Sequence, residues 1–250
     1  MKIQSAQCSM KGGRPYNEDT AFFTTTPSGF LAVVADGLGG CGGGETASRV
    51  AAEVLTEEFL AKPEITEENI NVILQCANKA VLSHQTPGQE MKTTLAALLA
   101  HKDVYAAVHV GDSRIYHFRD GQLIFRTEDH SVPQMAVLAG EITEGQIRFH
   151  EDRNRVLRAL GGDKRVKPNI RIWEGSTDRD AFLLCSDGFW EYVWETEMMA
   201  DLAKSDTPQK WLDYMIGRLG KRYSEKNDNF SAVAVFTDGG FRNLFVKNCS

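Results

Sequence analysis

Short apolar runs joined to aspartates are the feature that most limits how this chain can fold. Such runs are typical of strands that are buried on both faces. A carboxylate at the end of a buried strand lies close to the core, where an uncompensated charge is costly. The runs and their aspartates are 31–35 with Asp36, 104–110 with Asp112, 182–186 with Asp187, and 232–236 with Asp228. We therefore expect a layered fold that gathers these carboxylates into one pocket.

The remaining pattern predicts an α+β domain, because strands come in adjacent runs with long helices between the runs. Asp120-Gly121 predicts a hairpin turn, and Thr207-Pro208 is a typical helix start. Thr143 and Gln146 form a predicted capping box. The expected strands are 21–25, 30–35, 104–110, 115–118, 123–126, 181–185 and 232–237, and the expected helices are 45–60, 67–83, one that begins at 207–208, and a short one between 143 and 150.

Composition and charge exclude several classes of protein. The net charge of −6 argues against a nucleic-acid-binding protein. No apolar run approaches the roughly 18 residues that a membrane span requires, and the N-terminus has no apolar leader. The five cysteines are scattered without a C-x-x-C pair, as is typical of a reducing compartment. We expect a cytoplasmic protein with one domain at 1–240 and a C-terminal tail at 241–250.

The aspartates favour a particular kind of metal. Several converging carboxylates repel one another unless a cation compensates their charge, and oxygen ligands with few histidines or cysteines nearby favour Mg²⁺ or Mn²⁺ over zinc. An Asp-Gly pair after a strand is more often a plain turn, which is our interpretation of Asp120-Gly121 and Asp238-Gly239. The pairs Asp36-Gly37 and Asp187-Gly188 differ because other chemically informative segments accompany them.

Two such segments are Arg14 to Asp19, which reads RPYNED, and the glycine-rich run from Asp36 to Glu45. The glycine-rich run could cradle a phosphate at a helix N-terminus. It lacks the ending of a Walker A loop and the G-x-G-x-x-G fingerprint, and its helix opens with Glu45. We interpret it as flexible backbone that can approach a metal.

Taken together, these segments resemble the metal-dependent serine/threonine protein phosphatases of type 2C, in a bacterial-type form. The matches lie in the order of the family and are spread from residue 14 to residue 229. They are 14–19 (RPYNED), 34–40 (VADGLGG), 93–94 (TT), 111–116 (GDSRIY), 127–130 (TEDH), 157–161 (LRALG), 184–188 (LCSDG) and 228–229 (DN).

The resemblance implies a four-layer α-β-β-α sandwich of two antiparallel sheets flanked by helices, with two metal ions at one end. Asp36 would bridge the two ions, Asp187 and Asp228 would complete the first, and the Gly37 carbonyl would bind the second. Glu18 would hold metal-bound water. The implied activity is hydrolysis of phosphoserine and phosphothreonine by metal-activated water.

The resemblance also gives roles to residues around the ions. Arg14 would grip the substrate phosphate through its planar guanidinium group. Asp112, with Asp187, would hold a third ion. Asp19 would support the ligand network from behind, and so would His130 and Asn229, which lie beside matching acidic residues.

Some positions depart from the family pattern. Leu38 and Cys41 stand where many relatives carry histidine, and Lys92 stands where glycine is usual. None of these changes removes an expected ligand. Residues 131–158 resemble the flap that lies beside the active site in this family. No cysteine is expected to act as a nucleophile, because hydrolysis by metal-activated water needs no covalent phosphoenzyme.

Two alternatives stay open from the residues alone. The same carboxylates could serve a two-metal phosphomonoesterase that acts on small metabolites, or the protein could be a pseudophosphatase that binds phosphoproteins without turnover. The main prediction is a signalling hydrolase, monomeric, whose partners are phosphoproteins modified by a serine/threonine kinase.

Overall fold

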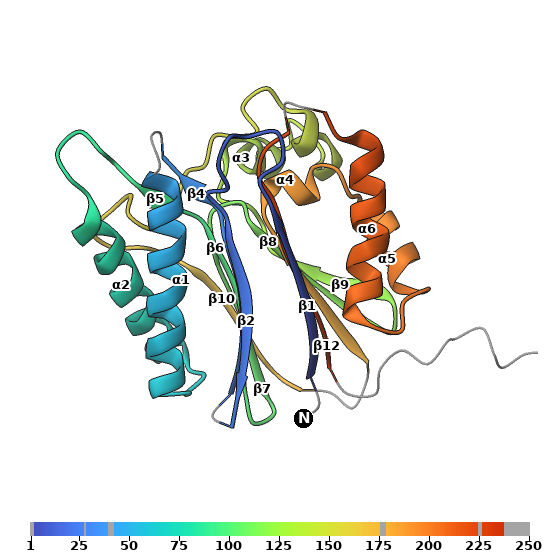
Figure 1. Cartoon of the computed structure of the whole chain (residues 1–250), viewed down its shortest axis with the longest axis horizontal. Helices are drawn as coiled ribbons and strands as arrows, with labels where there is room; N and C mark the ends of the chain where they lie inside the picture. Colours follow the sequence, from blue (N-terminus) through green and yellow to red (C-terminus); the bar gives the residue numbers. More distant parts are fainter. Residues whose placement is uncertain (1–2, 28, 40–42, 176–178, 225–226, 238–250) are drawn as a thin grey trace, which may run out of the picture.

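Two five-stranded antiparallel sheets lie face to face at the centre of the molecule, with helices on both outer sides (Figure 1). The computed structural model of the chain describes residues 3–27, 29–39, 43–175, 179–224 and 227–237. The first sheet has the order β1 (Ile3–Met10), β12 (Phe230–Thr237), β11 (Asp180–Cys185), β8 (Arg114–Arg119) and β9 (Gln122–Arg126). The second has the order β10 (Asn169–Glu174), β7 (Val104–Val110), β6 (Leu95–His101), β3 (Gly29–Ala35) and β2 (Thr20–Thr26).

The helices form the two outer layers. The long helices α1 (Gly43–Ala61) and α2 (Glu67–His84) cover the second sheet, and α5 (Glu195–Leu202) and α6 (Pro208–Arg222) cover the first (Figure 1). The remaining elements are α3 (Val132–Leu138), a 3-10 turn η2 (Glu144–Phe149), the short helix α4 (Asp187–Trp190), and a ribbon of β4 (Gly37–Leu38) and β5 (Lys92–Thr93). This arrangement confirms the predicted α+β sandwich.

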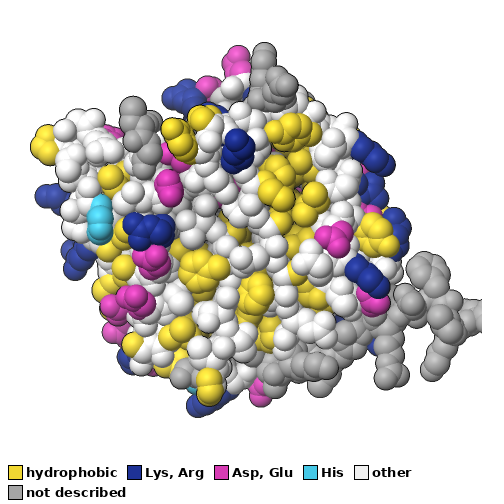
Figure 2. All heavy atoms as spheres, viewed as in Figure 1, with side chains coloured by type: hydrophobic (Ala, Val, Ile, Leu, Met, Phe, Trp, Pro, Cys, Tyr) yellow, Lys and Arg dark blue, Asp and Glu magenta, His cyan; other side chains and the backbone are white. Residues whose placement is uncertain are grey.

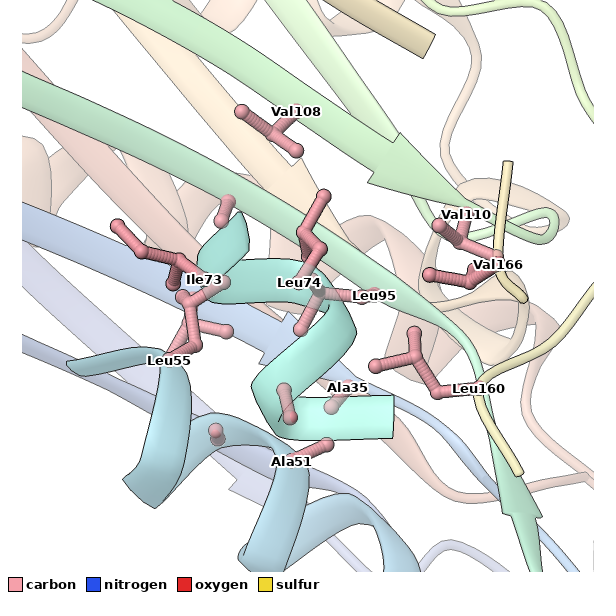
Figure 3. Packing of buried hydrophobic residues seen from close by; sticks show 14 of the residues in the cluster. Ala35, Ala51, Leu55, Ile73, Leu74, Leu95, Val108, Val110, Leu160 and Val166 are labelled. Atoms are coloured by element: carbon pink, nitrogen blue, oxygen red, sulfur yellow. The ribbon is translucent and has the colours of Figure 1, made fainter. Parts of the chain in front are cut away.

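Strand β3 shows how the sequence produces these layers. Successive side chains of a strand point to opposite faces. Leu31, Val33 and Ala35 pack in the cluster beneath α1 and α2, whereas Val34 and its alternate neighbours pack between the sheets. The strand is therefore apolar without interruption. Figure 3 shows Leu55 of α1 beside Ile73 of α2, and Leu74 of α2 beside Leu95 of the second sheet.

The sequence predicted the local structure unevenly. Every expected strand and helix is present, and the hairpin at Asp120-Gly121 is confirmed, since both residues have positive φ angles, 49° and 78°. The prediction missed β1, β6, β10 and the two-residue strands β4 and β5. It also missed α3, α4 and α5, of which α4 has only four residues and so shows no helical period.

Two further observations concern the surface charge and the expected lack of a membrane span. On the face shown in Figure 2, acidic and basic side chains lie side by side mainly toward the edges, and hydrophobic and uncharged groups occupy the middle. Among the described residues, no helix combines the length and apolar character needed to cross a bilayer. The expected tail at 241–250, Cys41 and the turn at Asp238-Gly239 lie outside the described residues.

Candidate active site

The ends of three strands meet at a cavity of about 850 Å³ at the end of the sandwich that carries β4 and α4 (Figure 1). Asp36 follows β3, Asp187 follows β11 as the first residue of α4, and Asp228 lies just before β12. The cavity is lined by Arg14, Pro15, Tyr16, Glu18, Asp36, Gly37, Leu38, Gly39, Glu45, Asp112, Asn154, Val156, Asp187, Asp228 and Asn229. Of the ten predicted site residues, only Asp19 and His130 do not line it.

The glycine-rich run allows three backbone segments to crowd together behind this cavity. A Cβ atom at Gly37 would collide with the carbonyl oxygen of Gly44 and lie 2.6 Å from that of Glu18. A Cβ at Gly44 would lie 2.9 Å from the Glu18 carboxylate. Glycine at both positions is therefore a packing requirement, which brings the segment of Glu18 against the start of α1.

Glycine has a similar role after Asp187. A Cβ at Gly188 would collide with the Asn229 carbonyl, so this Asp-Gly pair starts a helix that packs against the segment before β12. Asn229 in turn holds the N-terminal loop. Its side chain accepts a hydrogen bond from the Glu18 N–H at 2.8 Å and donates to the carbonyls of Lys11 and Tyr16.

The aspartates at the cavity are buried (Asp19 and Asp112) or partly buried (Asp36 and Asp187), in an environment that disfavours their charge. Burial and the charges of neighbouring aspartates raise the pKa of Asp36 and of Asp112 well above the ordinary value. Burial, with the charge of Asp228, raises the pKa of Asp187 to about 6. Burial raises the pKa of Asp19 to about 7, although hydrogen bonds from serines oppose the rise. Four ionised carboxylates here would require a compensating cation.

The donor atoms fit a hard divalent cation. Buried Oδ1 atoms of Asp19 and Asp187 have no hydrogen-bond partner among the described residues, and the oxygen-rich lining is what Mg²⁺ and Mn²⁺ prefer. Arg14 Nη2 donates to Asp228 Oδ2 at 2.7 Å. In this conformation, no three described His, Cys, Asp or Glu side chains converge into a ready-made ligand cluster. A cation would therefore have to draw the carboxylates inward.

Asp19 lies behind the cavity. Its Oδ2 accepts a hydrogen bond from the Ser186 hydroxyl at 2.8 Å, and the same hydroxyl accepts the Ser231 N–H. Asp19 thus joins the segment before α4 to β12. This geometry agrees with a supporting role rather than a direct contact with substrate.

His130 holds the turn that carries Asp112. The ring Nδ1 of His130 accepts a hydrogen bond from the Gly111 N–H at 3.1 Å, and the backbone N–H of His130 donates to the Gly111 carbonyl at 2.8 Å. Burial, together with the neighbouring His109 and Arg158, lowers the pKa of His130 to about 4. The ring is therefore neutral near pH 7 and can accept this hydrogen bond.

The sequence did not reveal Glu191 as a neighbour of the site. It lies one helical turn after Asp187, and Arg153 Nε contacts its carboxylate at 3.1 Å. Burial and the charge of Asp187 raise its pKa to about 7. The four-residue spacing would have shown this proximity if α4 had been predicted. Burial also raises the pKa of Cys8 to about 12 and that of Cys185, as expected for cysteines that are not nucleophiles.

Comparison with known proteins identifies the family. Residues 11–227 match the family described as protein phosphatase 2C. The serine/threonine phosphatase stp of Listeria monocytogenes is 31% identical over 235 residues, which cover 90% of this chain and 92% of the relative. The chain and that relative therefore correspond over nearly their whole lengths.

Solved structures agree with this match. The serine/threonine phosphatase PstP/Ppp of Mycobacterium tuberculosis has a TM-score of 0.82 at 28% identity, covering 95% of this chain and 99% of that one. The catalytic domain of PstP in complex with two manganese ions has a TM-score of 0.77 at 27% identity, covering 94% and 99%. On the family match, the curated relative and the shared fold, this chain belongs to the protein phosphatase 2C family and is a serine/threonine protein phosphatase.

Proposed function

We propose that the cavity lined by Arg14, Asp36, Asp187 and Asp228 is where this phosphatase hydrolyses phosphoserine and phosphothreonine in its protein substrates. One observation carries the proposal: partly buried aspartates with raised pKa line an open cavity that also contains an exposed arginine. Perturbed carboxylates in a cleft are costly and are typical of functional sites.

The proposed cofactor is a pair of Mn²⁺ or Mg²⁺ ions held by Asp36, Asp187, Asp228 and the Gly37 carbonyl, with Glu18 acting through water. Asp112 with Asp187 would hold a third ion. When bound, such ions neutralise the carboxylates and supply an activated water near neutral pH. The structure of PstP with two manganese ions supports this cofactor and favours manganese.

Arg14 is proposed to exchange partners during substrate binding. Its guanidinium pairs with Asp228, and the two side chains are 55% and 39% exposed. An ion pair this exposed contributes about 0–1 kcal/mol, so little is lost when Asp228 turns to a cation. The freed guanidinium can then bind two phosphate oxygens at once, which would orient the phosphate in the cavity.

The wider arrangement of the protein follows from this site. We propose that residues 1–240 act as one catalytic domain and that the flap at 131–158 borders the substrate, since its Asn154 and Val156 line the cavity. Phosphoserine and phosphothreonine are made by serine/threonine kinases, so the substrates would be proteins modified by such a kinase. A cytoplasmic monomer is the simplest setting for this exchange.

A substrate panel tests the proposal. Purified protein would be assayed with phosphothreonine and phosphoserine peptides and with small phosphorylated metabolites, in Mn²⁺, in Mg²⁺ and in excess chelator. We expect metal-dependent hydrolysis with higher kcat/KM on the peptides. Higher kcat/KM on metabolites would support the small-metabolite alternative, and absence of metal-stimulated turnover on every substrate would support a pseudophosphatase.

A further inference from the structure

A buried tryptophan, Trp190, lies against two arginine side chains beside the proposed metal site. The guanidinium carbon of Arg114 is 3.5 Å from the centroid of the Trp190 ring, and that of Arg148 is 5.4 Å away. Both distances are within the range of cation–π attraction. The tryptophan is only 1% exposed, so solvent does not screen these contacts.

Trp190 also contacts the two segments that carry Asp112 and Asp187. Its indole Nε1 donates to the Asp112 carbonyl at 2.9 Å. It is the last residue of α4, the four-residue helix that begins with Asp187. One rigid side chain therefore fixes the loop of one proposed ligand relative to the helix of another.

The charges around the ring are paired in a defined way. Arg114 makes two hydrogen bonds to Asp129, at 2.8 and 2.7 Å, and Arg148 donates to Glu195 at 2.6 Å. The Tyr116 hydroxyl also donates to Glu195, at 3.1 Å. Buried charges are tolerated only with such partners, and their geometry leaves few alternative arrangements.

The second arginine belongs to the flap. Arg148 lies in η2, and the adjacent Ile147 is buried in the same cluster as Phe189 and Trp190. The Nη1 of Arg148 is buried without a hydrogen-bond partner among the described residues. The position of η2 thus depends on contacts with Trp190 and Glu195 beneath it.

We infer that Trp190 is a positioning residue, which fixes Asp112 relative to Asp187 and couples their geometry to the seating of the flap through Arg148. The inference rests on the proposed metal role of these aspartates. Residues that orient metal ligands from behind typically change metal affinity about 10–100-fold when replaced. Metal affinity should therefore respond to changes at Trp190 and, through it, at Arg148.

Trp190→Phe and Trp211→Phe provide a matched pair. Trp211 is also fully buried in the same apolar cluster, and its Nε1 donates to the Met198 carbonyl in α5 at 2.9 Å rather than to a segment that carries a proposed ligand. Each variant loses one indole and one hydrogen bond. Isothermal titration of Mn²⁺ into the metal-free proteins should show affinity about tenfold weaker in Trp190→Phe and within about twofold of wild type in Trp211→Phe.

Arg148→Met gives a second measurement that leaves Trp190 in place. We expect weaker Mn²⁺ binding, and no additional loss when it is combined with Trp190→Phe, because residues acting through one contact are not additive. Unchanged affinity in both single variants, or equal losses in Trp190→Phe and Trp211→Phe, would overturn the inference. If the wild-type protein itself bound no Mn²⁺, the proposed metal site would fail first.

Discussion

The apolar layer beneath α1 and α2 and the aspartate cavity affect folding in opposite directions. In the layer, Leu55, Leu74 and their neighbours exclude water almost completely, and each buried leucine contributes roughly 1.5–3 kcal/mol to folding. In the cavity, Asp36 and Asp187 are partly buried, and the raised pKa of each means that its ionised form opposes folding. The comparison teaches that the apolar layers stabilise a site that would not be stable by itself.

The largest effect is expected from Asp187→Asn, which removes one charge from the cavity without changing its size. Activity should fall about 10³-fold or more, because a proposed metal ligand and its charge are lost. The metal-free protein should become more stable, by about 1–3 kcal/mol at pH 7.5, because a carboxylate with a raised pKa is replaced by a neutral group. Denaturant unfolding in chelator and a phosphopeptide assay measure the two changes.

Asp213→Asn is the matched control, since the same atoms change on the exposed face of α6. It should leave activity unchanged and stability within about 0.5 kcal/mol of wild type. If Asp187→Asn retained near-full turnover, the assignment of Asp187 as a ligand would be wrong. If Asp187→Asn lowered the stability of the metal-free protein, the ionised carboxylate of Asp187 would not oppose folding, contrary to the comparison above.

The opposite result is expected from Leu55→Ala in the apolar layer. Leu55 of α1 is fully buried in the cluster that α1 forms with α2 and the second sheet. Its truncation should therefore destabilise the protein by about 2–5 kcal/mol. The folded fraction should keep its kcat, because Leu55 is not among the residues that line the cavity. Val72→Ala on the exposed face of α2, where the side chain is 54% exposed, is the control and should change stability little. A large loss of kcat in folded Leu55→Ala would show that the two regions are not independent.

The continuous apolar strands explain how much of this could be predicted from the sequence. Strand β3 is buried on both faces, so its run of apolar residues was visible, and so was Asp36 at its end. Strand β1 is an edge strand with mixed exposure, and its residues IQSAQCSM show no clear alternation. The positions of the proposed ligands along the chain were therefore visible in the sequence, while part of the scaffold around them was not.

Contacts between residues far apart in the chain could not be predicted from the sequence, for another reason. The pair of Arg14 with Asp228 joins residues 214 positions apart, and Trp190 reaches Asp112 across 78 positions. No periodicity records such contacts, because they depend on the packing of the layers. The family resemblance indicated which residues share a site but gave no partner for Trp190.

The next effect concerns pH and sharpens the contrast between the two regions. The pKa of Asp187 is about 6 in the folded protein and about 3.9 when unfolded. Below pH 4 the carboxyl is protonated in both states and costs nothing. As the pH rises to about 6, the unfolded chain releases the proton first, so folding becomes less favourable. The advantage of Asp187→Asn over wild type should therefore be near zero at pH 4 and reach its full value above pH 6.

The quantity to measure is the difference in the free energy of unfolding between wild type and Asp187→Asn. His130, whose pKa is lowered to about 4, contributes the opposite slope between about pH 4 and 6.5, and it does so in both proteins. Denaturant unfolding at several pH values in chelator gives the difference directly. Leu55→Ala should show a constant difference from wild type over the same range. A constant difference for Asp187→Asn would contradict the raised pKa of Asp187.

The smallest effect is expected from Arg14→Lys, which keeps the charge at the cavity and removes the planar fork. Stability should change by less than about 0.5 kcal/mol, because the ion pair with Asp228 is exposed. The kcat/KM for a phosphopeptide should fall about 10–100-fold, since lysine cannot bind two phosphate oxygens in parallel. Arg49→Lys on α1, whose ion pair with Glu53 is similarly exposed, is the control and should change neither quantity. If Arg14→Lys kept the wild-type kcat/KM, Arg14 would act on the substrate only through its charge, and the aspartates would be the sole part of the cavity that requires exact geometry.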